Sequence, residues 1–172
     1  MKKLSLLLVL LSWPLFASAQ DAITKFYGKY AESEDFTTVY ISNRMFQMFA
    51  GMTDDEDREL RAAIRDIGGL RILSTDSRDG QTLYREASNL IPSSEYEELM
   101  VVKEGKEQTR FMIKENKQGQ IIELVMISGT DEGFTIMSFV GIINLEQISK
   151  MSSNMDIRGF EHLDDLEKQH RK

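Results

Sequence analysis

The chain of 172 residues contains no cysteine. Disulfides, thiolate nucleophiles and thiolate metal ligands are therefore excluded, and packing alone must stabilise the fold. Histidine is almost absent too. The chain has only two, His162 and His170, and both lie close to the C-terminus. A catalytic or zinc-binding histidine needs a rigid element beside a cleft. Ser-His-Asp, Cys-His and zinc sites are therefore not expected, and we predict no catalytic residues, no cofactor and no metal site.

The sequence also lacks a glycine-rich phosphate loop and a nucleophile elbow. Its 28 acidic residues make some close pair of carboxylates unavoidable, but no motif selects one. The acidic run 54–57 is explained by the start of a helix, whose dipole favours acids there. These absences favour a non-catalytic domain. A carboxylate-based hydrolase without a recognisable motif stays open as an alternative.

The N-terminus has the pattern of a secretory signal peptide. A basic start at residues 2–3 precedes an apolar run at 4–16, and small residues follow. We predict cleavage between Ala19 and Gln20, which makes 1–19 the signal peptide. The apolar run is shorter than the roughly 20 residues that span a bilayer. We therefore expect an exported protein without a membrane anchor, most simply periplasmic, with full secretion as the alternative.

The net charge is −7 at pH 7. An acidic surface disfavours nucleic acid and anionic membranes as partners, because both are negatively charged. Residues 20–154 are long enough for one domain with a real core. The charged tail 155–172 is expected to be partly helical, or helical only on a partner. An envelope protein is therefore a possible partner, while the oligomeric state is not indicated.

The stretch from Tyr96 to Ile143 predicts four β-strands joined by short turns. Runs rich in Val, Ile, Phe and Met are broken at regular intervals by glycine with polar neighbours, which is typical of hairpins. The strands are expected at Tyr96–Lys103, Gln108–Glu115, Gln120–Ser128 and Phe134–Ile143. The last two carry apolar residues on both faces, which indicates inner strands.

Helices and strands alternate in the first half. Helices are expected at Asp21–Glu32, Asn43–Gly51, Thr53–Gly69 and Ser77–Leu90, and strands at Phe36–Ser42 and Leu70–Thr75. Thr53 with Glu56 forms a capping box, and Gly68 is expected to end that helix. A last helix is expected to begin at Asn144.

Methionines recur on one face of the second predicted helix. Met45, Met48, Phe49 and Met52 hold helical spacing. The simpler interpretation is a soft filler of the core. The alternative is an adaptable binding surface, because methionine side chains are flexible. A third hypothesis is a small carrier, with a pocket for an apolar ligand between sheet and helices lined by Met45, Met48, Met100 and Met137.

Several short motifs resemble a known family when they are taken in order. They are Lys25–Tyr30, Val39–Ser42, Tyr96–Met100, Ile121–Leu124 and Gly141–Leu145. This order is similar to that in domain of unknown function 4252, a group of exported proteins from Bacteroidota. The resemblance implies an envelope address and a compact α+β domain, and it brings no catalytic residues. Some relatives carry a lipobox cysteine in the signal, which this chain lacks, so membrane anchoring is not implied here.

The sequence thus predicts a single α+β domain. Its antiparallel sheet is built on the four-strand C-terminal meander and extended by two earlier strands, with amphipathic helices packed on one face. The function that we expect is a non-catalytic binding or interaction domain of the envelope. The hydrolase and the carrier of an apolar ligand are the alternatives.

Overall fold

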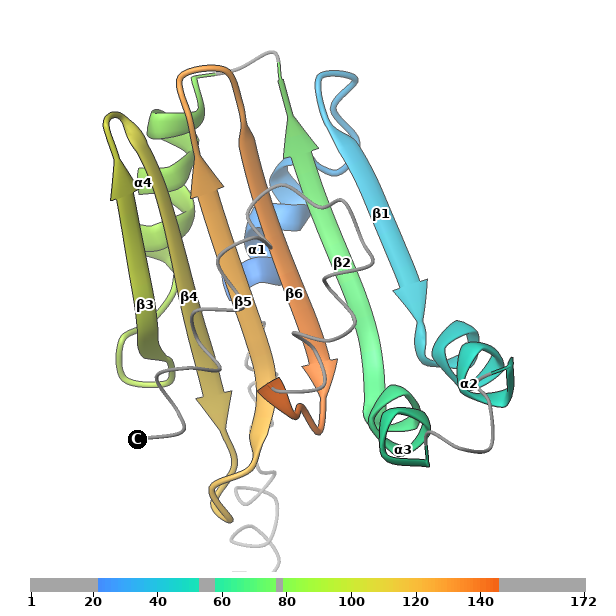
Figure 1. The fold of residues 1–172 in the computed structure, drawn as a ribbon. Helices are drawn as coiled ribbons and strands as arrows, with labels where there is room; N and C mark the ends of the chain where they lie inside the picture. The colour runs from blue at the N-terminus through green and yellow to red at the C-terminus, as the bar shows by residue number, and fades with distance from the viewer. Residues whose placement is uncertain (1–21, 53–57, 77–78, 146–172) are drawn as a thin grey trace, which may run out of the picture.

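The structure is a computed structural model that describes residues 22–52, 58–76 and 79–145. Within these ranges it has four helices and six strands (Figure 1). The helices are α1 (Ala22–Tyr30), α2 (Asn43–Met52), α3 (Arg58–Asp66) and α4 (Gly80–Leu90). The strands are β1 (Thr37–Ser42), β2 (Ile67–Thr75), β3 (Glu97–Glu104), β4 (Glu107–Glu115), β5 (Ile121–Gly129) and β6 (Phe134–Gly141). The predicted α+β class is confirmed.

All six strands form one antiparallel sheet in the order β1-β2-β6-β5-β4-β3. The predicted meander is therefore present as β3 to β6, and β2 and β1 extend it beyond β6. Gly105 and Gly119 supply the positive φ angles of 58° and 74° in the first two hairpin turns, a conformation that glycine adopts without strain. The inner strands β5 and β6 are buried along most of their length, as their apolar pattern predicted.

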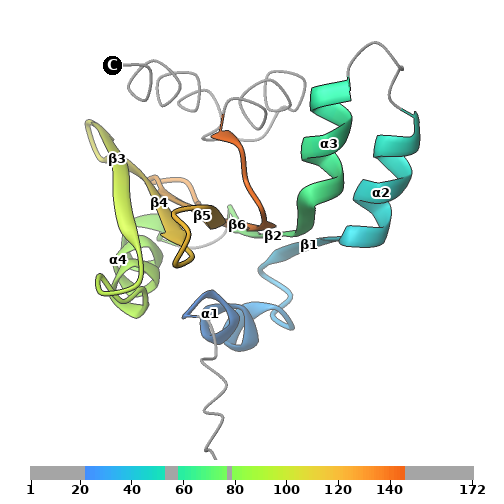
Figure 2. The ribbon, with the colours of Figure 1, turned by 90° about the horizontal axis from the view of Figure 1, so that it is seen from below.

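One face of the sheet is covered by α1 and α4 (Figure 2). Ile23 and Phe26 of α1 and Leu83 and Ala87 of α4 pack with side chains of the strands, including Leu73, Met112, Val125, Ile127, Phe134 and Ile136. Both helices are therefore held by an apolar stripe at helical spacing, as their sequences predicted.

The opposite face carries a second apolar cluster, to which α2 and α3 contribute. Phe46, Ala50 and Ile64 pack with side chains of that face, among them Leu70, Phe111, Leu124, Met126, Met137 and Phe139. Figure 2 shows α2 and α3 on this side, away from α1 and α4. The prediction that the helices cover one face is therefore wrong for the described helices. Helical periodicity identifies the buried stripe of a helix but not the sheet face that receives it.

The junction of α3 and β2 differs from the prediction. The helix expected at Thr53–Gly69 ends at Asp66, and Gly68 belongs to β2 and does not cap the helix. The pairing of β2 with β6 shifts register there, and a Cβ on Gly68 would lie 3.1 Å from the carbonyl oxygen of Val140. The glycine thus serves close strand pairing at a bulge. The predicted capping box lies outside the described residues. Residues 146–172, which include the tail and all but the start of the last helix expected from Asn144, lie outside them as well.

Candidate interaction surface

α2 directly follows β1 at the margin of the sheet, and its first residue fixes its position. The Asn43 side-chain amide donates a hydrogen bond of 2.7 Å to the carbonyl oxygen of Ile67, at the start of β2. The Gln47 amide in turn donates to the Asn43 side-chain oxygen at 2.7 Å. Phe46 and Ala50 are the buried residues of the helix. The face that α2 presents to solvent is therefore set by a buried stripe and by polar contacts at its start.

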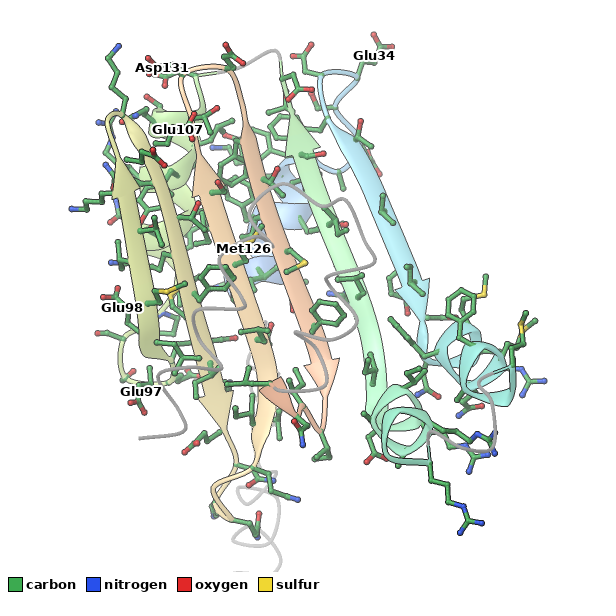
Figure 3. All side chains as sticks on the ribbon, viewed as in Figure 1. Glu34, Glu97, Glu98, Glu107, Met126 and Asp131 are labelled. Carbon is green, nitrogen blue, oxygen red and sulfur yellow. The ribbon has the colours of Figure 1, made fainter. Side chains whose placement is uncertain are left out.

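That outer face is apolar. The exposed fractions are 43% for Met45, 55% for Met48, 43% for Phe49 and 80% for Met52. Sulfur atoms on the outer side of α2 are visible in Figure 3. We call these four residues the methionine face. The interpretation of them as core filler is wrong, because the stripe that packs inward is Phe46 and Ala50, one residue further round the helix. Large exposed apolar groups that gather on one element are typical of contact surfaces.

β1, which leads into α2, is a second exposed feature. Its first four residues, Thr37 to Tyr40, are exposed, and 62% of the Tyr40 surface is accessible. The Arg71 guanidinium lies 5.9 Å from the centre of the Tyr40 ring, so the ring is held by a cation at its face. On the outward side of β1, Figure 1 shows no further strand along the length of the element. Among the described residues, β1 is thus an edge strand of the sheet.

The structure separates the four methionines that were predicted to line an apolar pocket. Met137 is fully buried in the centre of β6, and Met100 of β3 packs against the same cluster. Met45 and Met48 lie on the exposed side of α2 instead. Met126, labelled in Figure 3, is another buried methionine of this cluster. The four side chains are thus divided between a packed core and an exposed helix face.

A buried carboxylate lies within the sheet, on the side covered by α1 and α4. Glu123 is only 6% exposed, and its two carboxylate oxygens accept hydrogen bonds of 2.7 Å from the hydroxyls of Tyr96 and Ser138. Ser138 and Tyr96 are themselves buried. Hydrogen bonds of this kind are what allow a carboxylate to be buried at all. No sequence pattern indicates this cluster, because its members come from two strands and a loop.

Two open grooves are lined mainly by charged and polar side chains. One, of about 580 Å³, lies between α4 and the strands β3 and β4, where Glu98 pairs with the Arg110 Nε at 2.7 Å. The other, of about 340 Å³, contains Glu95, Glu97 and Glu115, of which Glu95 pairs with Lys114 at 2.6 Å. All three of these glutamates are exposed. These glutamates therefore do not form a carboxylate pair that is shielded from water, which acid–base catalysis favours.

Among the described residues, no group of three or more acidic or histidine side chains is arranged to hold a metal ion. In the same part of the chain, no helix is long and apolar enough to cross a membrane.

A family model matches residues 30–151 of the chain, which include β1 to β6 and α2 to α4. The chain belongs to the family of domain of unknown function 4252. The resemblance of the sequence to this family is thereby confirmed. No curated protein and no solved structure matches the chain significantly. The matched region contains both the methionine face and β1, so both features lie within the domain that defines the family.

Proposed function

We propose that this member of the family is an exported, non-catalytic domain that binds a protein partner through the methionine face of α2. The observation that carries the proposal is the exposure of Met45, Met48, Phe49 and Met52 on a helix that Phe46 and Ala50 anchor in the core. A monomeric soluble protein rarely leaves such a group of side chains in water without a partner. Export rests on the signal pattern of residues 1–19.

The composition of the methionine face indicates which kind of surface would bind it. α2 contains no acidic residue, and Arg44 is its only charged residue. An apolar, nearly uncharged helix face fits the apolar side of another helix or an apolar groove on a protein. Methionine contributes flexible, polarizable contacts, so the face can adapt to its partner without repacking the helix. The partner is therefore expected to present apolar anchors with few charges at the centre of the contact.

A photo-crosslinking amino acid placed at Met48 of the mature protein, in envelope extract, tests the proposal. The matched control places the same group at Leu90, an exposed apolar residue at the end of α4 with 37% of its surface accessible. We expect one defined protein adduct from position 48 and none from position 90. Identical adducts from both positions would contradict a specific surface, and adducts with lipid alone would make the face a membrane contact.

The partner identified in this way is then purified for direct binding measurements. Met48→Lys combined with Met52→Lys is expected to weaken its affinity by about 30-fold, since truncated or charged anchors at a contact centre often cost about 2 kcal/mol. Leu90→Lys should leave the affinity unchanged. An unchanged affinity for the double variant would refute the methionine face. Mass spectrometry of the secreted chain separately tests export, with Gln20 expected as its first residue.

A further inference from the structure

The two edges of the sheet differ in how they resist pairing with another strand. An edge strand offers unpaired backbone N–H and C=O groups, and natural proteins protect such edges with charges, proline, bulges or short strands. β3 is protected in this way. Four of its eight residues are charged, and its pairing with β4 shifts register between Glu98 and Met100. Figure 3 shows Glu97 and Glu98 at the start of β3.

β1 has none of these protections. Its six residues, Thr37–Ser42, include no charge and no proline. They pair with β2 in an unbroken register from Thr37 opposite Ser74 to Ser42 opposite Gly69. The strand is rich in β-branched and aromatic residues, which favour extended pairing. β1 is therefore an edge on which a further strand can add.

The contacts of Tyr27 show which backbone groups of β1 face outward. Its hydroxyl lies 3.0 Å from the carbonyl oxygen of Val39 and 2.5 Å from that of Ile72, the residue directly opposite. Two opposed carbonyls that reach one hydroxyl both point into the space between β1 and β2. Backbone groups alternate in direction along a strand, so those of Thr38 and Tyr40 point away from β2. Among the described residues, no backbone hydrogen bond outside the strand ladders uses either residue.

We propose that two copies of this chain pair through β1, antiparallel and with the two-fold axis at Val39, to form one continuous twelve-stranded sheet. In this register Thr38 and Tyr40 of one copy exchange backbone hydrogen bonds with Tyr40 and Thr38 of the other. Val39 meets Val39 as a pair without hydrogen bonds, and Thr37 meets Ile41. All opposed residues are uncharged, so self-pairing brings no like charges together.

The charges that flank β1 favour a second copy and this axis. Glu34 and Arg44 lie five residues before and five residues after Val39, and both are exposed. Glu34 stands at the start of β1 in Figure 3, and α2 lies at its opposite end. An antiparallel pair centred on Val39 therefore places the Arg44 end of each copy beside the Glu34 end of the other. Residues of opposite charge then lie near both ends of the pair, which favours the antiparallel direction more than it adds affinity.

A second copy also closes the assembly. A two-fold interface uses the same patch on both chains, so it covers both unprotected edges at once. The two edges that remain are both β3, whose charges and bulge oppose further addition. The proposal goes beyond binding at the methionine face, because α2 begins only where β1 ends and is not needed for the strand pair.

Cysteine scanning tests the register, since the chain has no cysteine of its own. Opposed residues in a pair without hydrogen bonds have Cα atoms about 4.5 Å apart, within the range that a disulfide spans. Val39→Cys is therefore expected to form a disulfide-linked dimer in mild oxidant. Val102→Cys, the matched change on β3, should stay monomeric. Equal crosslinking at both edges, or preferential crosslinking by Tyr40→Cys, would overturn the proposal.

Sedimentation equilibrium of the mature wild-type chain tests the dimer without crosslinking. We expect a concentration-dependent dimer that Val39→Lys abolishes, because it places two ammonium groups face to face at the axis. Val102→Lys and Met48→Lys should leave the dimer intact, and circular dichroism checks that each variant is folded. A monomeric wild type, or a dimer that survives Val39→Lys, would refute pairing through β1. Loss of the dimer with Met48→Lys would instead assign self-association to the methionine face.

Discussion

The β3 side and the β1 side of the domain belong to the same sheet, but they differ in the contacts that their side chains make. On the β3 side, ion pairs join neighbouring elements, such as Lys106 with Asp131 at 2.8 Å and Lys114 with Glu95 at 2.6 Å. α4 lies so close to the sheet that a Cβ on Gly80 would overlap the carbonyl oxygen of Gly133. On the β1 side, the strand is uncharged and α2 exposes most of its apolar side chains.

We interpret the β3 side as complete by itself and the β1 side as the part through which the proposed contacts are made. Close backbone contacts and bonded polar groups leave little to gain from a partner on the β3 side. Exposed apolar side chains on the β1 side leave water only when another chain covers them, and the outward backbone groups of β1, which water can solvate, can also pair with a further strand. The same kind of substitution should therefore have different consequences on the two sides.

Glycine-to-alanine substitution should give the largest contrast. In Gly80→Ala the new methyl group meets backbone atoms of Gly133 and Thr130, which cannot move aside as a side chain could. We expect a loss of more than about 3 kcal/mol in the free energy of unfolding. Gly51→Ala in α2 meets no atom within 4 Å, and should stabilise the helix by about 0.5–1 kcal/mol. Urea unfolding of both variants measures the change in the free energy of unfolding. Similar losses in the two variants would contradict the difference between the two sides.

Tyrosine-to-phenylalanine substitution should give the next largest contrast. Tyr96→Phe removes one of the hydrogen bonds to the buried Glu123 carboxylate, so we expect a loss of about 1–3 kcal/mol. Tyr40→Phe changes an exposed side chain, and its effect should stay within about 0.5 kcal/mol. Chemical unfolding at neutral pH measures both. Equal effects would show that Glu123 does not depend on its hydroxyl partner.

Acidification should lower the stability of the fold through Asp79 at the start of α4, on the β3 side. This effect should be smaller than those of the two substitutions above. The Thr82 hydroxyl, at 2.7 Å, and the amides of Thr82 and Gln81 donate to Asp79 and lower its pKa below the ordinary value. A carboxyl with a lowered pKa in the folded state stabilises the fold above its unfolded pKa, and this contribution disappears as the pH falls through the folded value.

Asp79→Asn keeps a side-chain oxygen for the cap but does not titrate. On acidification below about pH 4, the wild type should therefore lose part of its advantage in melting temperature over Asp79→Asn. Thermal melts of both proteins across this range provide the measurement. Parallel pH profiles would show that the cap does not depend on ionisation of Asp79.

Much of the fold could be predicted because it depends on local patterns. The predicted meander agrees with the structure within two residues at every strand end, since alternation and glycine turns define hairpins locally. The end of α3 was missed because Gly68 is required by pairing with β6, a strand distant in sequence. Strand order and the face that receives each helix depend on such distant contacts as well.

The candidate surface was predicted only as an alternative. α2 carries two apolar stripes, one with Phe46 and Ala50 and one with the methionines. Helical spacing alone is compatible with burial of either stripe. The choice depends on how α2 leaves β1, which the Asn43 contact to Ile67 fixes. The unprotected edge could have been suspected from the uncharged sequence of Thr37–Ser42, but only the strand order shows that β1 is an edge.

Amide hydrogen exchange measured by NMR at increasing protein concentration tests the contrast between the two sides most directly. The amides of Thr38 and Tyr40 face away from β2 and should exchange fast in dilute solution. If two copies pair through β1, the exchange of these amides slows as the concentration rises, while amides along β3 keep constant rates. Rates at β1 that do not change with concentration, or that slow equally at β3, would contradict it.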